Sequence, residues 1–430
     1  MGGNAKVTVE EIIPPEPLSP PDQTRYADEL WTEAALGLAE QSSVRRQAML
    51  EGCKWDPQVG DTSTLAAFPV VMPRRVWNKL ARQAEQLTAE AFAAEAEIVR
   101  RPELHARLGL PKALQQVMVA DAPRPPAAGR VIRFDFHPTS EGWRISEANS
   151  DVPGGFAEGS HFTQLMAGHY PHLQIAGDPA AAWSKVLADT VGPGGMIALL
   201  SATGFMEDHQ VIAFLAERLR EQGCRTHLAR PDQIYWHNGV ARLDTPWYRG
   251  PLAAIWRFYQ AEWLTRLPKT SGWNCFFRGG KTPVANPAMA VISESKRFPL
   301  VWDQLAAKLP TWRALLPETC DIREGSWIKD DGWLLKTAYC NTGDTVSARA
   351  WLPPRKWLQV WWNARLFPAN WVLQKRFESK PLLTPVGWRH PCVGIYTVNG
   401  RAAGAYARLS EKPLIDFRAV DAALLLKDDE

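Results

Sequence analysis

Two short runs of alternating apolar and polar residues lie close together in the first third of the chain. Residues 131–136 read VIRFDF and residues 143–149 read WRISEAN, and the segment HPTSEG between them contains Pro, Ser and Gly. Such alternation on both sides of a turn-forming segment predicts a β-hairpin. A turn centred near Glu141 sets the register of the two strands.

In that register Asp135 lies opposite Glu147, and Arg133 lies opposite Asn149 on the same face of the hairpin. Two carboxylates about 5 Å apart repel by roughly 3 kcal/mol at an effective dielectric constant of about 20, so a cation is expected between them. Carboxylate and amide oxygens suit Mg²⁺, and the guanidinium of Arg133 suits a phosphoryl group or an oxyanion. The alternative is a surface hairpin whose acids pair with arginines such as Arg144.

The other hydrophobic patterns predict helices early in the chain and mixed strands and helices later. Apolar residues recur at spacings of three and four from Tyr26 to Glu51 and from Arg74 to Arg101, which is typical of amphipathic helices. Between residues 195 and 260 a strand, a helix and a strand follow in order, which implies a parallel pair with a right-handed crossover. Asn-Gly pairs predict tight hairpins at residues 238–239 and 399–400.

Two lysines in the last third of the chain are candidate phosphate ligands. After Gly279 a loop leads into a predicted helix that carries Lys296. Lys336 ends a predicted strand just before a small-residue loop that contains Gly343, and another strand is expected after this loop. A lysine in such a place can reach a nucleotide phosphate, although lysines at strand ends are also common without any function.

Composition and charge exclude several classes of protein. With 430 residues, 46% hydrophobic and 22% charged, the chain is an ordinary globular protein, and a net charge of +3 without a basic run argues against nucleic acid as a partner. No apolar run approaches the length of about 18 residues that a membrane span needs. Six cysteines without CxxC spacing are expected to be reduced thiols in a cytoplasmic protein.

Two further compositional features have a functional and a structural interpretation. Twenty tryptophans could stack on a substrate ring, but their spread along the chain favours packing, and only residues 357–362 form a dense cluster. His161, His169 and His172 could be read as zinc ligands, but no acid or cysteine completes the set at a suitable spacing.

Together these segments resemble the glutathionylspermidine synthase-like branch of the ATP-grasp ligases, from about Ala122 to the C-terminus. The resemblance rests on an R-x-D-F segment, an E-x-N-x-D-x-P segment with twelve residues from acid to acid, and an R-x-Y-x-x-E-W segment. It also includes a lysine after an N-P pair, a second lysine about forty residues later, a glutamine on a strand and a late arginine. The matching residues are Arg133, Asp135, Glu147, Asn149, Asp151, Pro153, Arg257 to Leu264, Asn286, Pro287, Lys296, Lys336, Gln374 and Arg408.

The resemblance implies an ATP-grasp-type fold of mixed α/β class with a pre-ATP-grasp α/β domain, and the helical periodicity before it predicts an N-terminal helical region. The expected divisions are a disordered or extended arm at 1–22, the helical region at 23–121, the pre-ATP-grasp domain with its metal-binding hairpin at 122–280, and the nucleotide-binding domain at 281–430.

The resemblance also implies a Mg²⁺-dependent ligase that uses ATP to convert a carboxylate into an acyl phosphate, which an amine then attacks. Its partners would be small-molecule carboxylates and amines. The implied metal ligands are Asp135, Glu147 and Asn149, and the implied nucleotide ligands are Lys296, Lys336, Gln374 and Gly343. Arg133 and Arg408 would stabilise the acyl phosphate and the tetrahedral oxyanion, because phosphoryl transfer depends mainly on positioning and charge neutralisation.

The lysine loop departs from the family pattern. Asn341 stands where an arginine is usual, and Thr342 stands where a glutamate is usual. A weaker phosphate clamp favours the alternative of a non-catalytic ATP-grasp-like module that binds a nucleotide or another ligand. A third alternative is a Trp-lined carbohydrate-binding or hydrolytic protein with Asp135 and Glu147 as its acid pair. Because the N-terminal helices match the family poorly, glutathione and spermidine are not assumed as substrates.

Overall fold

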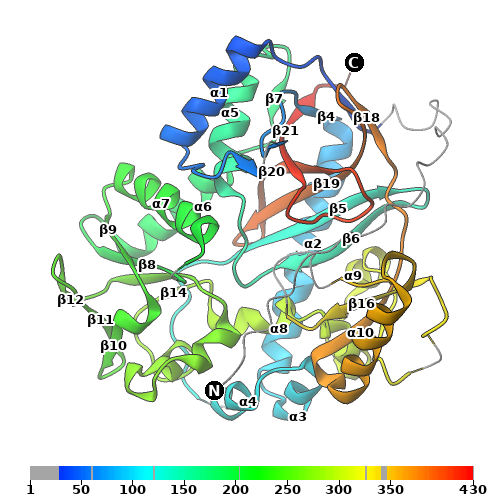
Figure 1. Ribbon diagram of the computed structural model, residues 1–430. Helices are drawn as coiled ribbons and strands as arrows, with labels where there is room; N and C mark the ends of the chain where they lie inside the picture. The colour runs from blue at the N-terminus through cyan, green and yellow to red at the C-terminus, as the bar shows by residue number, and fades with distance from the viewer. Residues whose placement is uncertain are drawn as a thin grey trace.

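The structure is a computed structural model that describes residues 29–59, 62–119, 122–202, 204–324, 327–339 and 346–429. The arm expected at 1–22 and the loop residues Asn341, Thr342 and Gly343 lie outside these ranges. The chain builds a central sheet with a parallel sheet on one side and a smaller antiparallel sheet on the other (Figure 1).

The central sheet combines strands from the beginning, the middle and the end of the chain. It has nine strands, seven of them in the order β1-β4-β21-β20-β19-β5-β6, while β18 pairs with β19 and β7 pairs with β21. The strands are β1 (Trp31–Thr32), β4 (Val70–Pro73), β5 (Val131–Thr139), β6 (Gly142–Asn149), β7 (Gln174–Ile175), β18 (Leu382–Thr384), β19 (Gly387–Val398), β20 (Arg401–Ser410) and β21 (Val420–Lys427). The predicted hairpin is therefore β5–β6, and it extends the C-terminal strands.

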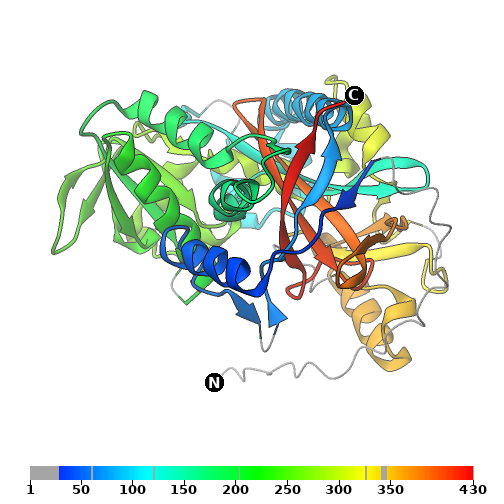
Figure 2. The same ribbon diagram turned by 90° about the horizontal axis from the view of Figure 1, so that it is seen from above.

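The long helix α2 (Arg74–Ile98) covers one face of the central sheet, as Figure 2 shows from above. Its apolar side chains recur at helical spacing, and Leu80, Leu87 and Ile98 are fully buried in one core with Phe134 of β5. The opposite face is covered by shorter elements: α1 (Leu38–Leu50), η3 (Glu158–Phe162), α5 (Thr163–Ala167) and α6 (Pro179–Val191). The hairpin thus has one face in a dry core and the other face available for a site.

The parallel sheet has the strand–helix–strand order that the sequence predicts. Its order is β14-β13-β8-β9, and every neighbouring pair is parallel. Its elements are β8 (Met196–Ser201), α7 (Met206–Glu221), β9 (Arg225–Ala229), β13 (Ala254–Phe258) and β14 (Val284–Ala285), and a three-stranded sheet is added by β10 (Ile234–His237), β11 (Val240–Asp244) and β12 (Arg249–Pro251). Both predicted Asn-Gly hairpins are confirmed, with φ of 50° and 79° at residues 238–239 and 47° and 82° at residues 399–400.

The smaller antiparallel sheet has the order β15-β17-β16 and packs against α10. Trp357 of α10 is buried, and its ring centroid lies 5.9 Å from that of Trp327, so this cluster is largely core packing. The elements are β15 (Thr319–Cys320), β16 (Trp333–Thr337), α10 (Pro354–Leu366) and β17 (Trp371–Lys375). The remaining strands and α-helices are β2 (Gln58–Val59), β3 (Thr62–Ser63), α3 (Pro102–His105), α4 (Lys112–Val117), α8 (Val291–Glu294) and α9 (Pro310–Leu315).

Three local predictions were wrong. The first helix begins only at Leu38. Of the residues before it, Trp31–Thr32 form β1, which pairs with β4. The helix expected to carry Lys296 ends at Glu294, since Ser295 leaves the helical conformation and the backbone N–H of Lys296 donates to Ala338 O at 2.9 Å. After residues 340–345, the described residues contain only an isolated bridge of Ser347 with Leu335 in place of the expected strand.

The domain boundaries expected after residues 121 and 280 remain predictions. Strands from both sides of each boundary share a sheet, because β4 pairs with β21 across the first boundary and β13 pairs with β14 across the second. Among the helices in the described part of the chain, none has both the length and the apolar character of a membrane span.

Candidate functional site

The β5–β6 hairpin has the predicted pairing near its open end and a bulge beside Asp135. Arg133 lies opposite Asn149, as the sequence predicts. Phe134 then pairs with Ala148 and Phe136 pairs with Ile145, so two residues of β6, Ser146 and Glu147, occupy the place opposite Asp135. The bulge therefore replaces the expected one-to-one pairing of Asp135 with Glu147.

The carboxylate of Asp135 is the centre of a buried charge cluster. Arg133 Nε donates to Oδ1 at 2.8 Å, and Oδ2 accepts from Arg408 Nη2 at 2.6 Å and from Asn149 Nδ2 at 3.1 Å. Burial alone would raise the pKa of Asp135, but the two guanidinium groups outweigh it and hold this pKa well below its ordinary value. Asp135 is 1% exposed and remains an anion throughout the neutral range.

A glycine on the neighbouring strand makes room for Arg133. Gly394 lies opposite Asp135 in the β19–β5 pair, and a Cβ atom at Gly394 would lie 2.9 Å from Arg133 Cδ. The guanidinium also donates through Nη1 to Gly154 O at 2.9 Å, and it lies 5.8 Å from the centre of the Tyr406 ring. Arg133 is thereby held on three sides by the sheet, the turn after β6 and an aromatic ring.

The two predicted nucleotide lysines reach the same hairpin. Lys296 Nζ lies 3.3 Å from Glu147 Oε2, and Lys336 Nζ donates to Ser146 O at 3.2 Å. Burial would raise the pKa of Glu147, but the positive charge of Lys296 contributes most to holding it below its ordinary value. The bulge residues therefore connect both lysines to the Asp135 cluster.

Gln374, a predicted nucleotide ligand, forms hydrogen bonds with two neighbouring side chains. Its Oε1 accepts from Lys336 Nζ at 2.6 Å, and its Nε2 donates to Thr319 Oγ1 at 3.2 Å. In this arrangement Gln374 orients Lys336. Gly343, another predicted nucleotide ligand, lies outside the described residues.

His137 belongs to the site and was missed in the sequence. It follows Arg133 and Asp135 at the two-residue spacing of one strand face, which was the signal available. Its Nε2 lies 3.1 Å from Ser146 Oγ, and its ring centroid is 5.3 Å from that of Phe377. Burial lowers the pKa of His137 to about 4, so the ring is neutral at physiological pH and adds no charge to the cluster.

A second buried acidic group adjoins the site and was not predicted as such. Asp151 forms a fully buried ion pair with Arg257, with one N–O distance of 3.2 Å. Burial, reinforced by the negative charge of Asp151, raises the pKa of Glu262 to about 8 and that of Glu294 to about 7. Glu294 is two residues before Lys296 and accepts hydrogen bonds from the backbone N–H groups of Ser150 and Asp151 at 2.7 and 2.9 Å.

The side chain of Asn286 fixes the start of β5 relative to the residue that follows β6. Its Oδ1 accepts from Val131 N at 2.8 Å, while its Nδ2 donates to Val131 O at 2.7 Å and to Ser150 O at 2.9 Å. One amide therefore joins the start of β5 to the end of β6, and it fixes where the hairpin enters the site.

Two of the alternatives weighed for the hairpin conflict with this geometry. A surface hairpin is wrong, since Asp135 is buried and Arg144 pairs with Glu141 at 2.9 Å. A hydrolytic acid pair needs one carboxyl group with a raised pKa as its general acid. The pKa values of Asp135 and Glu147 are both lowered, so the pair lacks a protonated acid at neutral pH.

The donor set of the hairpin fits Mg²⁺ in its chemistry. The described residues contain no group of three or more His, Cys, Asp or Glu side chains that could hold a metal ion. Asp135, Glu147 and Asn149 offer two carboxylates and an amide oxygen, and Mg²⁺ commonly takes one or two carboxylates and completes its shell with water and phosphate oxygens. The hairpin alone is thus a partial shell that a phosphate-bearing ligand would complete.

Comparison with known proteins identifies the family. The model of the glutathionylspermidine synthase pre-ATP-grasp family matches residues 40–420. The chain belongs to this family. Membership confirms the resemblance inferred from the motifs and agrees with the mixed α/β architecture of several sheets.

One solved structure shows the same fold at low identity. A glutathione synthetase-like effector from Globodera pallida, in its apo form, has a TM-score of 0.64 at 13% identity, covering 90% of this chain and 96% of that chain. A candidate gamma-glutamylcysteine synthetase from Methylobacillus flagellatus has a TM-score of 0.41 at 12% identity over 77% of this chain and 87% of its own. D-alanyl-alanine synthetase A from Vibrio cholerae has a TM-score of 0.33 at 13% identity over 51% and 68%. No curated protein matches the chain.

Proposed function

We propose that this member of the glutathionylspermidine synthase pre-ATP-grasp family is an ATP-dependent carboxylate–amine ligase. It would form an amide or peptide-like bond through an acyl phosphate, with Mg²⁺ as the metal. The observation that carries the proposal is the gathering of four cations on one hairpin face. Four cations surround two carboxylates there: Arg133, Arg408, Lys296 and Lys336 around Asp135 and Glu147.

The cations of this face support a polyphosphate as the ligand. Guanidinium and ammonium groups that gather in a largely buried place suit an anion that carries several charges. The triphosphate of ATP is such an anion, and Mg²⁺, when bound, would neutralise further phosphate charge and polarise the transferring phosphoryl group. In the proposal, Asp135, Glu147 and Asn149 hold the metal, and Lys296 and Lys336 contact phosphate oxygens.

The two arginines have the properties that an acyl-transfer site needs. Arg133 and Arg408 are oriented by the same carboxylate, so neither has to reorganise when negative charge develops nearby. Burial opposes the charge of both guanidinium groups, but Asp135 raises both pKa values above the ordinary value. We assign them to the acyl phosphate and to the oxyanion that forms when the amine attacks it.

We assign the second acidic group, Asp151 with Glu262, to the amine. Glu262, whose pKa is about 8, is mostly protonated at neutral pH, and its ionised fraction would accept the proton that the amine releases. The ordinary alternative is a structural ion pair with Arg257.

The proposal also includes a cytoplasmic location, which the free thiols support: Cys53, Cys224, Cys275, Cys320 and Cys392.

The test is ADP release from Mg²⁺-ATP across a panel of amino acids, short peptides and polyamines, each carboxylate offered with and without each amine. A ligase releases ADP and phosphate only when both substrates are present, and the product gains the mass of an amide. Lys336→Met serves as the site-knockout control. ADP release that is equal with and without substrates, or is unchanged in Lys336→Met, would contradict the proposal.

A second candidate is a nucleotide-binding module without turnover. The departures at Asn341 and Thr342 favour it, because they remove a cation and an acid from the loop expected to cover the phosphates. Calorimetry distinguishes the two: saturable Mg²⁺-ATP binding that is lost in Lys336→Met, combined with no ADP release for any substrate pair, supports the module. Absence of both binding and turnover would contradict both functions.

A further inference from the structure

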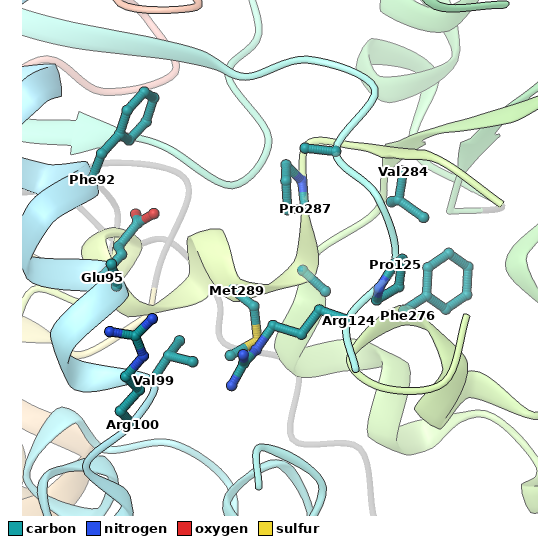
Figure 3. A pocket seen from close by; sticks show the side chains of 13 residues that line it. Phe92, Glu95, Val99, Arg100, Arg124, Pro125, Phe276, Val284, Pro287 and Met289 are labelled. Carbon is teal, nitrogen blue, oxygen red and sulfur yellow. The ribbon is translucent and has the colours of Figure 1, made fainter. Parts of the chain in front are cut away.

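Two charged side chains at the cavity between α2 and residues 276–289 already have protein partners (Figure 3). Arg124 donates to Val119 O at 3.3 Å, and Glu95 pairs with Arg130 at 2.7 Å. Helix α10 differs, because its outward side combines exposed apolar side chains with cations for which the described residues contain no ion-pair partner. Figure 2 shows α10, in orange at the lower right, at the outer edge of the molecule. This side of α10 is therefore a candidate interaction surface.

Three exposed apolar residues form a stripe along α10. Leu358, Trp362 and Leu366 follow each other at intervals of four residues, which places them on one side of the helix, and their exposed fractions lie between 47% and 68%. The opposite side carries Trp357, which is buried in the core of the smaller sheet. Trp361 lies beside the stripe, and its ring centroid is 4.7 Å from that of Trp362. The exposed indole of Trp362 is thus supported by a neighbouring ring.

Two arginines flank this stripe near its ends. Arg355 is three residues before Leu358, and Arg365 is three residues after Trp362, so each lies next to the stripe. Both arginines are exposed, and neither has an ion-pair partner among the residues that the structure describes. Helix α10 contains no acidic residue, since its sequence is PRKWLQVWWNARL. The stripe therefore fits a ligand with apolar groups between two negative charges about 15 Å apart, which is the helical rise from the first arginine to the second.

One segment of this chain has a sequence with these properties. Residues 10–18 read EEIIPPEPL, in which two isoleucines and two prolines stand between Glu11 and Glu16. In the extended conformation of proline-rich segments, at about 3.1 Å per residue, these two glutamates would be about 16 Å apart. Such segments commonly bind surfaces lined by aromatic side chains, because their restricted backbone loses little entropy on binding. The segment thus matches the stripe in charge, in apolar character and in spacing.

The connection to the first described residue is long enough for this contact. Residues 19–28 join the segment to Glu29, and they span up to about 35 Å when extended. A compact chain of this length has a diameter of about 55 Å, so the connection covers more than half of the molecule. Strand β1 contacts β18, and residues 376–381 join β18 to β17, the strand that follows α10. The segment therefore starts from the side of the central sheet that leads to α10.

We propose that the stripe on α10 binds an acidic, proline-rich segment, and that residues 10–18 of the same chain occupy it. The isoleucines and prolines pack against Trp362 and its apolar neighbours, and the two glutamates pair with the two arginines. The contact covers an exposed apolar surface with a piece of the chain itself. The stripe and the segment contain none of the residues assigned to the nucleotide site, so the proposal does not depend on ligase activity.

The test measures binding of a fluorescent peptide of residues 7–20 by fluorescence anisotropy. The peptide is expected to bind a variant that lacks residues 1–22 saturably, and to bind the full-length protein at least about tenfold more weakly, because the attached segment competes at an effective concentration in the millimolar range. The affinity should fall as the salt concentration rises, since salt screens exposed charge pairs. Equal affinities for the two proteins, or no saturable binding to the shortened one up to about 1 mM, overturn the proposal.

An exchange of charges tests the location. In the shortened protein, Arg355→Glu/Arg365→Glu should weaken binding at least about tenfold, because attraction at both ends of the stripe becomes repulsion. A peptide that carries Glu11→Arg/Glu16→Arg should restore the affinity. Both arginines are exposed, so the melting temperature should stay close to that of the parent protein. Undiminished binding in the exchanged protein, or no recovery with the exchanged peptide, contradicts the assignment of the stripe.

Two further variants separate the stripe from general surface charge and from other occupants. Lys79→Glu/Arg82→Glu, at exposed positions of α2, should bind the peptide as the parent protein does, and a comparable loss there would overturn the proposal. Trp362→Ser should weaken binding at least about tenfold, because large aromatic side chains dominate such contacts. If the full-length protein forms a dimer that Trp362→Ser dissociates, a second copy covers the stripe and the proposal is wrong. Binding to phosphatidylserine-containing vesicles that Trp362→Ser abolishes would also refute it.

Discussion

Arg408 of β20 donates to Asp135 of β5 at 2.6 Å, although 273 residues separate them in the chain. Strand β19 lies between the two strands, so the contact crosses the width of a neighbouring strand within one sheet. Asp135 is consequently shared by two guanidinium groups, one from its own strand and one from the C-terminal part of the chain. The candidate site is completed only when the end of the chain has joined the sheet.

Replacing Asp135 should destabilise the fold as well as remove a proposed metal ligand. In Asp135→Asn the two buried guanidinium groups lose their shared anion and repel each other, so we expect the free energy of unfolding to fall by about 3 kcal/mol or more. Urea denaturation at pH 7.5 measures this. Asp303→Asn is the matched control, because Asp303 pairs with Arg313 while its side chain is 91% exposed, and the change should cost less than about 1 kcal/mol. Equal losses in the free energy of unfolding would show that the buried ion pairs of Asp135 stabilise the fold no more than the exposed pair of Asp303 with Arg313 does.

Replacing Lys336 should weaken nucleotide binding. Lys336→Met removes a buried cation that lies between Gln374 and the bulge of β6, and we expect the affinity for Mg²⁺-ATP to fall at least about tenfold. Isothermal titration calorimetry provides the measurement. Lys375→Met lies on the adjacent strand with its side chain 60% exposed and should leave the affinity unchanged. An unaltered affinity in Lys336→Met would remove this residue from the nucleotide site.

His137 should make the protein lose stability in mild acid. Its pKa is lowered from 6.5 to about 4 in the folded protein because burial disfavours the imidazolium. Between these pH values the unfolded chain binds the extra proton, so the free energy of unfolding decreases as pH falls, by up to roughly 3 kcal/mol across the window. His137→Asn should flatten the profile of stability against pH from 6.5 to 4, whereas His172→Asn, at a side chain 58% exposed, should not. A His137→Asn profile parallel to that of the wild type would refute the assignment.

Glu262 should make the protein lose stability as pH rises, whereas His137 does so as pH falls. Burial and the charge of Asp151 raise its pKa from 4.5 to about 8, so the folded protein retains a proton that the unfolded chain releases. Stability is therefore lost as pH rises from about 4.5 to 8. Glu262→Gln should be more stable than the wild type at pH 8 by on the order of 1–3 kcal/mol, with the difference disappearing toward pH 4.5. Denaturant melts at four pH values measure this difference, and a constant difference across the range would contradict the raised pKa.

Local patterns in the sequence determined much of the architecture. The alternation in residues 131–149 specified the hairpin, because successive strand side chains point to opposite faces. The Asn-Gly pairs specified two hairpin turns, since their residues tolerate positive φ. The motif spacing identified the family, and Arg133, Asp135 and Asn149 do lie in one hydrogen-bonded group.

Tertiary contacts decided the rest. The end of α8 before Lys296 and the pairing of Gln374 with Lys336 involve residues far apart in the chain, and the bulge beside Asp135 interrupts the regular alternation from which the register was predicted. The charge states of His137 and Glu262 depend on burial, which exists only after packing. The sequence by itself thus determined which strands and turns form and which polar residues share a strand face, because these follow from backbone geometry within a few residues. Only the tertiary structure decided which charges meet, because strand pairing and desolvation join distant parts of the chain.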